Sequence, residues 1–287
     1  MLRYFNTLRE SCMDTSEITF TKMSGTGNDF ILLNNSTADL ALDWPALARR
    51  YCHRRLGIGA DGVIVLAPSQ DADFTMRIFN ADGSEAEMCG NGARCAAAFA
   101  VDQGLAASTM RFSTLAGLIE ATVQPGVVSL KMTNPHSLEG KIHIAIDDKE
   151  YALYCLDTGV PHAILFTEDA DSMQVDTLGR AIRHHQMFAP GGTNADFVQV
   201  IDRDHIKVRT YERGVEAETL ACGTGATASA ILSHAYKGVR DKPVHVRMPG
   251  GDLMIDFSLE NGQYKNVWLI GGVETVFRGV IPCTHGT

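Results

Sequence analysis

Glu218-Thr-Leu-Ala-Cys-Gly-Thr-Gly-Ala226 is a short polar turn with a cysteine at its centre, and it runs directly into an alanine-rich apolar segment. This pattern predicts that Cys222 stands where a helix begins. The first amides of a helix have no partner inside it, so the amides of Gly223, Thr224 and Gly225 are free to bind an anion. The same amides and the helix dipole also favour the thiolate form of a neighbouring cysteine.

The same pattern occurs a second time, in Met88-Cys-Gly-Asn-Gly-Ala-Arg-Cys95. Cys89 precedes a Gly-x-Gly turn and an apolar run that closes at Gly104, just as the other run closes at Gly238. Two helices of nearly equal length are therefore predicted, each starting at a thiol and ended by a glycine in the C′ position.

Other features of the chain repeat at almost the same offset as the two cysteines. Four pairs of residues lie 132 to 135 positions apart: Thr26 with Thr158, Asp61 with Asp196, Arg77 with Arg209, and Cys89 with Cys222. Each pair lies in a segment of similar pattern, and four coincidences are improbable. The sequence therefore predicts two copies of one unit.

Each copy is predicted to contain a strand, a tight turn, a strand, a helix, two or more strands, the cysteine helix and further strands. The later strands alternate apolar and polar residues, as in 244–248. Both cysteine helices are apolar nearly all round, as in 226–232, which is typical of a helix enclosed by strands. An α+β fold is expected, with each helix surrounded by antiparallel strands of its own domain.

The domain boundary is expected near Pro135, where a strand meets a proline. Asp43 and Pro45 are a good N-cap and first-turn pair for the helix that follows them. The predicted divisions are an N-terminal extension at 1–17, a first domain at 18–134 that also takes the C-terminal strand at about 268–287, and a second domain at 135–267.

Composition and charge exclude several classes of protein. The net charge of −9 and the pI near 5.5 argue against a nucleic-acid partner, which favours a basic face. No apolar run approaches the ~20 residues of a membrane span. The first 17 residues lack the apolar region of a secretory signal. Seven irregularly spaced cysteines do not suggest a disulfide framework, so the expected location is the cytoplasm.

Two thiols at two helix starts suggest a particular chemistry if the two copies face each other across a cleft. Both helix starts would then bind one carboxylate, and the thiols would lie on opposite sides of the carbon attached to it. One thiolate could remove the proton of that α-carbon while the other thiol returns a proton to the opposite face, which inverts the stereocentre.

The chain resembles the diaminopimelate epimerase family, whose members are cofactor-independent amino acid epimerases of lysine and cell-wall biosynthesis. The resemblance covers residues 18 to about 280. It is carried by the motifs Gly25-Thr-Gly-Asn-Asp-Phe30, Phe79-Asn-Ala-Asp-Gly-Ser84, Met88-Cys-Gly-Asn-Gly-Ala-Arg-Cys95, Thr193-Asn-Ala-Asp-Phe197, Tyr211-Glu-Arg-Gly214 and Ala221-Cys-Gly-Thr-Gly-Ala226. It implies two similar domains, each an antiparallel β-barrel-like sheet around a central helix, with the site in the cleft between them, and a homodimer.

The resemblance also implies roles for individual residues. Cys89 and Cys222 resemble the acid/base pair of the family, and no cofactor or metal is implied. The residues that resemble the cradle of the reacting carboxylate are Gly90, Asn91, Gly223 and Thr224. Those that resemble the side chains around the far amino acid group are Asn28, Asn80, Asn194 and Arg213. Glu212 and His162 resemble polar neighbours that bind substrate or tune catalysis.

The sequence departs from the family pattern at two positions and leaves other functions open. Val160 stands where the family usually has Asn, and Gly62 stands where some members have Gln. A proline-type racemase, which shares the paired Cys-Gly-x-Gly segments, is one alternative. A dithiol redox protein is another, and for His162 a structural role is equally compatible with the pattern.

Overall fold

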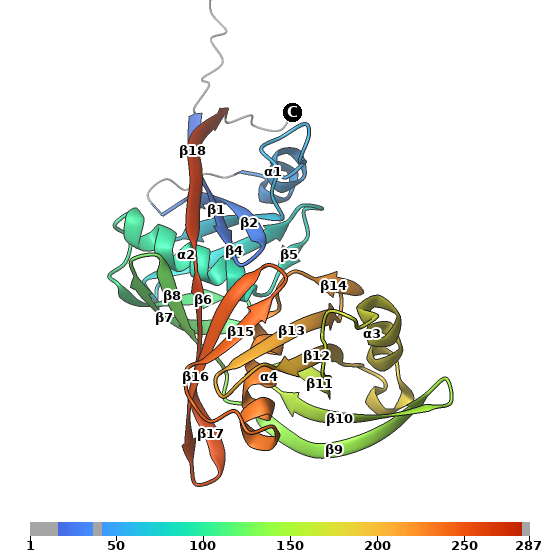
Figure 1. The fold of residues 1–287 in the computed structure, drawn as a ribbon. Coiled ribbons are helices and arrows are strands. Elements are labelled where there is room, and N and C mark those ends of the chain that lie inside the picture. Colours follow the sequence, from blue (N-terminus) through green and yellow to red (C-terminus); the bar gives the residue numbers. More distant parts are fainter. Residues whose placement is uncertain (1–16, 37–41, 283–287) are drawn as a thin grey trace, which may run out of the picture.

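The structure is a computed structural model that describes residues 17–36 and 42–282. The predicted N-terminal extension therefore lies outside the described residues, apart from Glu17, which begins the first strand. Figure 1 shows two halves, with the N-terminal half at the top and the C-terminal half below it.

The N-terminal half contains eight strands and two helices in the described residues. In chain order they are β1 (Glu17–Gly25), β2 (Asn28–Asn34), α1 (Trp44–Tyr51), β3 (Gly62–Ala67), β4 (Phe74–Asn80), β5 (Glu85–Ala86), α2 (Gly90–Asp102), β6 (Thr109–Thr114), β7 (Gly117–Gln124) and β8 (Val127–Lys131). Asp43 is the N-cap of α1, as predicted, and its carboxylate accepts a hydrogen bond from the amide of Ala46 at 2.9 Å.

The C-terminal half repeats this order after one additional strand. Its elements are β9 (His136–Ile146), β10 (Lys149–Asp157), β11 (Pro161–Phe166), α3 (Val175–Arg183), the 3-10 helix η1 (Gln186–Phe188), β12 (Asn194–Val200), β13 (His205–Glu212), β14 (Ala217–Thr219), α4 (Gly223–Tyr236), β15 (Val244–Met248), β16 (Gly251–Glu260) and β17 (Gln263–Gly272). The last strand is β18 (Glu274–Pro282).

The pairings of the strands repeat as well as their order. β1 to β8 pair with one another in the same pattern, and with the same directions, as β10 to β17. The predicted α+β fold built from two copies of one unit is therefore confirmed.

Most of these pairings are antiparallel, but four are parallel, which was not predicted. They are β2 with β3, β4 with β6, β11 with β12, and β13 with β15. A parallel pair needs a long crossover between its strands, and in each case a helix provides it. The two cysteine helices, α2 and α4, are such crossovers, so each one is held against the sheet of its own half.

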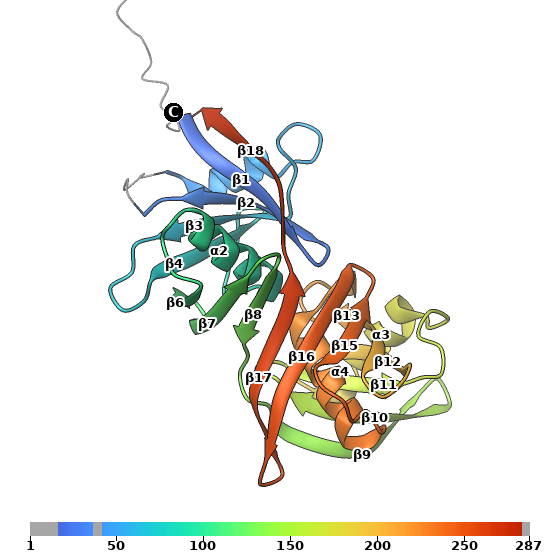
Figure 2. The same cartoon turned by 60° about the vertical axis from the view of Figure 1, so that its left-hand side comes forward.

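The end of the chain links the two halves. β17 pairs with β16 of its own half and, through its other edge, with β8 of the N-terminal half (Figure 2). β18 then runs along β1 as an antiparallel neighbour. We propose a boundary between Asn134 and Pro135, where the chain passes from β8 to β9, with the C-terminal strand assigned to the first domain.

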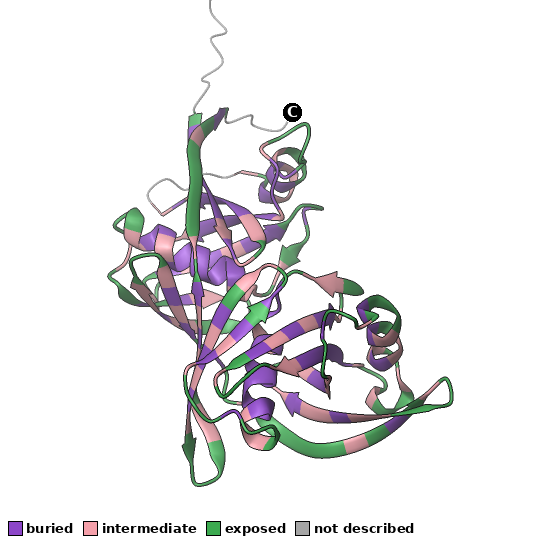
Figure 3. Ribbon diagram, in the orientation of Figure 1, coloured by how far each residue is buried: buried purple, intermediate pink, exposed green. Residues whose placement is uncertain are grey.

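The two cysteine helices are largely buried, as their apolar sequences predicted (Figure 3). Every residue of α4 from Gly225 to Ser233 is buried. Both helices end as expected, because Gly104 and Gly238 follow them with φ of 68° and 80°. Residues other than glycine rarely adopt such φ angles, which explains why glycine occupies both positions. None of the helices in the described part of the chain is long and apolar enough to span a membrane.

Candidate active site

Both predicted thiols stand at the starts of the central helices. Cys89 is the N-cap of α2 with φ −142° and ψ 120°, and Cys222 is the N-cap of α4 with φ −127° and ψ 110°. The Sγ atom of Cys222 accepts a hydrogen bond from the amide of Gly225 at 3.4 Å. The predicted cradle residues Gly90, Asn91, Gly223 and Thr224 therefore form the first turns of the two helices.

The two helix starts meet on one side chain. Leu269, on the strand β17 that joins the halves, places its Cδ2 atom against both first glycines. A Cβ atom at Gly90 would lie 3.5 Å from this methyl group, and a Cβ atom at Gly223 would lie 2.9 Å from it. The structure thus brings together two segments 133 positions apart, as the facing arrangement requires, and a side chain at Gly223 would require Leu269 to shift.

Burial governs the acidity of the two thiols. It raises the pKa of Cys89, and the amides of Gly92 and Asn91 partly oppose this rise. Burial also raises the pKa of Cys222, and the negative charges of Glu212 and Asp196 add to the effect. The helix amides alone therefore do not make these groups acidic in the absence of a ligand.

Glu212, at the end of β13, is a carboxylate whose charge affects both thiols. Its charge raises the pKa of Cys89 and that of Cys222. Burial raises the pKa of Glu212 itself. A group so placed affects how readily either thiol ionises, which agrees with the predicted tuning role.

His162 and Asp196 form a fully buried hydrogen-bonded pair. The Nδ1 atom of His162 lies 2.7 Å from Oδ2 of Asp196, and neither side chain is exposed to solvent. Thr210 donates a hydrogen bond to the other oxygen of Asp196 at 2.7 Å. The Nε2 atom of His162 has no hydrogen-bond partner among the described residues. The pair fixes the ring of His162 beside the start of α4 and leaves one ring nitrogen available.

Asn28 and Asn91 form a chain of hydrogen bonds at the start of α2. The side-chain amide of Asn91 donates to Oδ1 of Asn28 at 2.7 Å, and that of Asn28 donates to Asp61 at 2.8 Å. Asp61 also accepts a hydrogen bond from Arg54 at 2.6 Å. The two asparagines predicted to contact opposite ends of the substrate are therefore directly linked.

Asn194 and Arg213 lie together in the C-terminal half. Asn194 is buried and accepts a hydrogen bond from the backbone amide of Arg213 at 2.8 Å, while its own amide donates to the carbonyl of Pro161 at 3.0 Å. The guanidinium of Arg213 makes a long contact of 3.4 Å to the carbonyl of Gly191 and has no ion-pair partner within the described residues. Its charge is available for a ligand.

The side chain of Asn80 has no hydrogen bond to another predicted binding residue among the described residues. It is exposed at the end of β4, and its amide donates to the hydroxyl of Ser84 at 3.0 Å. At Gly62, a Cβ atom would lie 2.6 Å from the carbonyl oxygen of Phe79, so a side chain at this position would require the backbone to shift. Val160 is half-buried in the turn before β11.

Three residues with a structural part in the site were not predicted. Asp196 holds His162, Leu269 contacts both helix starts, and Arg94 donates to the side chain of Asn91 at 3.0 Å. The repeat gave one usable signal, because Asp196 matches Asp61, which also holds a predicted site residue. Neither Leu269 nor Arg94 had a signal beyond its place in an apolar stretch or a motif.

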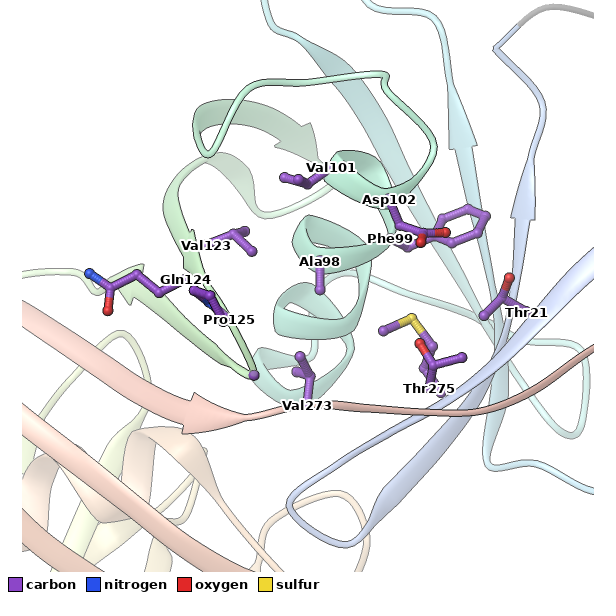
Figure 4. A pocket seen from close by; sticks show the side chains of 12 residues that line it. Thr21, Ala98, Phe99, Val101, Asp102, Val123, Gln124, Pro125, Val273 and Thr275 are labelled. Carbon is purple, nitrogen blue, oxygen red and sulfur yellow. The ribbon is translucent and has the colours of Figure 1, made fainter.

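A separate hollow of about 430 Å³ lies on the flank of α2 (Figure 4). Its lining is largely apolar and includes Phe99, Val101, Val123 and Val273, with Asp102 at its edge. It includes neither Cys89 nor Cys222, so it is distinct from the site at the helix starts.

One group of side chains in the described residues could share a metal ion. Asp202, Asp204 and His205 place their ligand atoms within 4.8 Å of one another on the turn before β13. Aspartate pairs of this kind are common on surfaces, and His205 is already hydrogen-bonded to both carboxylates. The group contains neither thiol.

Comparison with known proteins agrees with this geometry. A model of the diaminopimelate epimerase family matches residues 20–138 and 154–276. The diaminopimelate epimerase of Aquifex aeolicus (strain VF5) is 44% identical over 272 residues, which cover 91% of this chain and 96% of the relative. Among solved structures, a phenazine biosynthesis protein of the PhzF family from Bacillus anthracis has a TM-score of 0.70 at 14% identity, and covers 93% of this chain and 99% of its own.

A second solved structure has the same fold with a different named activity. A probable proline racemase from Agrobacterium radiobacter K84 has a TM-score of 0.66 at 18% identity, with 93% of each chain covered. At these identities the two structures establish the fold alone, whereas the family model and the relative from Aquifex aeolicus establish the family. The chain belongs to the diaminopimelate epimerase family, whose named members are isomerases.

Proposed function

We propose that this protein interconverts LL-diaminopimelate and meso-diaminopimelate by a two-base mechanism in which Cys89 and Cys222 exchange protons with the α-carbon. The observation that carries the proposal is the meeting of the two thiol-capped helix starts on Leu269. Membership of the family supports the choice of substrate, and the activity would serve lysine and peptidoglycan precursor biosynthesis.

The reaction needs one thiolate and one thiol at the start of each turnover. The thiolate takes the α-proton and becomes a thiol, and the electron pair of the broken C–H bond passes into the carboxylate-stabilised carbanion. The opposite thiol then donates its proton to the other face of the carbon and becomes a thiolate. The stereocentre is inverted, and the reverse reaction uses the same two groups with their roles exchanged.

Most of the rate acceleration must come from the helix starts. Positioned proton transfer contributes roughly 10²–10⁴-fold, which is too little for an α-proton as weakly acidic as that of an amino acid. Preorganised donors to the developing charge are worth on the order of 2.7–4 kcal/mol each. The amides of Gly90, Asn91, Gly223 and Thr224 are such donors, and the helix dipoles add only about 0.3–1 kcal/mol each.

The far end of the substrate carries a second ammonium and a second carboxylate. Arg213 has an available guanidinium, and Asn194 is fixed beside it by the 2.8 Å hydrogen bond to its backbone. We assign Arg213 to the far carboxylate, with amide and carbonyl groups of Asn28, Asn80 and Asn194 around both charges. A site built to pair such groups rejects analogues that lack them by about 10⁴–10⁵-fold. Val160 supplies no amide, so some of this selectivity should be lost.

Isotope exchange tests the proposal and separates it from its alternatives. Each of LL-diaminopimelate, L-proline and L-lysine is incubated with the protein in D₂O, and deuterium at the α-position is followed by NMR. Exchange with inversion for diaminopimelate alone is expected. Comparable exchange for proline would favour the proline-type racemase, whose fold this chain shares. Exchange for none of them, with a Cys89–Cys222 disulfide that forms reversibly, would favour a dithiol redox protein.

We also propose a homodimer in the cytoplasm. β18 exposes Val276, Phe277 and Val280, which a second copy could cover. The five described cysteines are all free thiols, which supports a reducing compartment. Light scattering during gel filtration measures the assembly, and a monomer at micromolar concentration would contradict it.

A further inference from the structure

Arg94 is the largest fully buried side chain in the described residues. It lies on α2, five positions after Cys89, and none of its atoms reaches solvent. Side chains on a helix lean back toward its N-terminus, so the guanidinium points toward the turn that carries the thiol. A charged group this deep in a protein is normally paired with an opposite charge.

The contacts of Arg94 are to neutral groups. Its Nη2 atom donates to Oδ1 of Asn91 at 3.0 Å and to the hydroxyl of Thr26 at 2.6 Å. Its Nε and Nη1 atoms have no hydrogen-bond partner, and no carboxylate of the described residues forms an ion pair with it. The guanidinium is therefore a buried positive charge that no negative charge of the described residues neutralises.

Both contacts of Arg94 are to parts of the site. Asn91 belongs to the first turn of α2 and passes its own hydrogen bond on to Asn28. Thr26 is at the tip of the turn between β1 and β2, in a left-handed conformation with φ of 50° that a β-branched residue rarely adopts. One nitrogen of Arg94 thus holds both the cradle asparagine and a strained turn.

One glycine makes room for the guanidinium, and a second lies at ordinary contact distance from it. A Cβ atom at Gly271 of β17 would lie 2.8 Å from Nε and 3.0 Å from Cζ of Arg94. A Cβ atom at Gly25 would lie 3.2 Å from the carbonyl of Asn91 and 3.8 Å from Nη2 of Arg94. The slot is formed by backbone from three elements, so the guanidinium cannot turn away to solvent.

The equivalent position of the other cysteine helix carries no charge. Thr227 stands five positions after Cys222, is fully buried, and donates its hydroxyl to the carbonyl of Gly223 at 2.9 Å. The charged groups that face Cys222 are Glu212 of β13 and Asp196 of β12, the latter paired with His162. Those that face Cys89 are Glu212 and Arg94.

We propose that Arg94 is a positioning residue of the site, whose buried and unpaired guanidinium fixes Asn91 and the Thr26 turn. It also brings to the start of α2 a positive charge that the start of α4 lacks. The functional role in this inference rests on the proposed two-thiol reaction. The consequence is an inequality between the two thiols before substrate binds, with Cys89 the more acidic of the pair. Burial raises the pKa of both thiols and the charge of Glu212 adds to the rise, but Arg94 opposes it at Cys89 whereas Asp196 adds to it at Cys222.

The first test compares the two thiols without changing Arg94. Cys89 is titrated in the Cys222→Ser protein and Cys222 in the Cys89→Ser protein, by the pH dependence of iodoacetamide alkylation at the cysteine peptide, read by mass spectrometry without substrate. The proposal expects a lower alkylation pKa for Cys89. The reverse order would overturn it. No turnover is needed, so this result is independent of whether diaminopimelate is the substrate.

The second test changes Arg94 in the same two backgrounds. Arg94→Met should raise the alkylation pKa of Cys89 by about one unit, which is about tenfold slower alkylation at neutral pH, and leave the profile of Cys222 in place. Arg94→Lys keeps the charge and should restore most of the Cys89 profile. Lys131→Met removes an exposed charge of the same half and should shift neither profile.

Three results would overturn the role of Arg94. They are an unchanged Cys89 profile in a folded Arg94→Met protein, equal shifts of both cysteines, and equal shifts with methionine and lysine at residue 94. Thermal melting establishes that each variant is folded. If Arg94→Met does not fold, the comparison of Arg94→Lys with the first test still decides, because a retained charge must keep Cys89 the more acidic thiol.

Discussion

Cys89 and Cys222 cap helices with nearly the same backbone angles, yet the charged groups around the two thiols differ. Glu212 acts on both thiols, but the buried guanidinium of Arg94 lies on α2 close to its start, whereas Asp196 lies beside the start of α4. The shared part is set by the local Cys-Gly-x-Gly sequence that duplication copied. The different part comes from residues that diverged afterwards.

The difference matters because a two-base reaction needs two groups in opposite protonation states. Two identical thiols would compete for one proton, whereas unequal surroundings separate their pKa values and assign an acid and a base. Structural repetition thus supplies the geometry for attack from two faces, and the divergence of the repeat supplies the difference in charge.

Replacing either thiol should have the largest effect. Cys89→Ser or Cys222→Ser is expected to lower kcat for epimerisation by about 10²–10⁴-fold, because a serine hydroxyl is a far weaker acid in the same position. The measurement is NMR of the interconversion of the two diaminopimelate isomers. Cys155→Ser, at a half-buried free thiol on β10, is the matched control and should keep its activity. Full activity in either of the first two variants would remove that thiol from the mechanism.

The repeated aspartates should differ in their contribution to stability. Asp196 and Asp61 occupy matching positions, but the side chain of Asp196 is 0% exposed and that of Asp61 is 36% exposed. Asp196→Asn should lower the free energy of unfolding by about 3–5 kcal/mol, because it removes one partner of a buried pair. Asp61→Asn should cost about 0–1 kcal/mol, since exposed pairs contribute little. Urea unfolding measures both, and equal losses would contradict the comparison.

The features predicted correctly depend on short stretches of sequence. The thiol-capped helix starts, the glycines that end both helices and the cap at Asp43 each follow from a few neighbouring residues. The repeat was also visible, because matching residues recur at a nearly constant offset. From these, the number of copies and the order of their elements could be predicted.

The features that escaped prediction depend on contacts between distant segments. Arg94 is 68 positions from Thr26, and its burial results from three elements closing around it. The pairing of His162 with Asp196 depends on the parallel contact of β11 with β12, which hydropathy patterns do not reveal. In the sequence, Arg94 is recognisable only as part of the Met88–Cys95 motif, and its neighbours do not indicate that its charge is buried and unpaired.

Glu212 should influence both thiols. Its negative charge disfavours a thiolate, so Glu212→Gln should lower the alkylation pKa and move the profile to lower pH. An effect of about one unit is expected at Cys222 and at Cys89, because Glu212 is the main opposing charge for each thiol. Each thiol is titrated in the background where the other is serine. Glu120→Gln, at an exposed pair, is the control, and a shift to higher pH would refute the assignment.

The smallest expected effect concerns α1 and α3, the helices of the two halves that do not begin at a thiol. The N-cap of α1 is Asp43, whose carboxylate accepts from the amide of Ala46, whereas the N-cap of α3 is Gln174, whose side chain makes no capping hydrogen bond. A lost cap costs typically about 1 kcal/mol, so Asp43→Ala should lower the free energy of unfolding by that amount. The measurement is the urea midpoint at constant slope.

Gln174→Asp is the reciprocal change, since it offers α3 the cap that α1 already has. Aspartate is among the preferred N-cap residues, and its charge also suits the positive end of the helix dipole. A gain of about 0.5–1 kcal/mol is expected, reduced by the nearby charge of Asp176 in the first turn of α3. Gln174→Ala removes the side chain without adding a cap and should be nearly neutral, which isolates the capping contribution. A loss of stability with aspartate would mean that the backbone before α3, at φ −80° and ψ 73°, does not let its carboxylate reach the free amides.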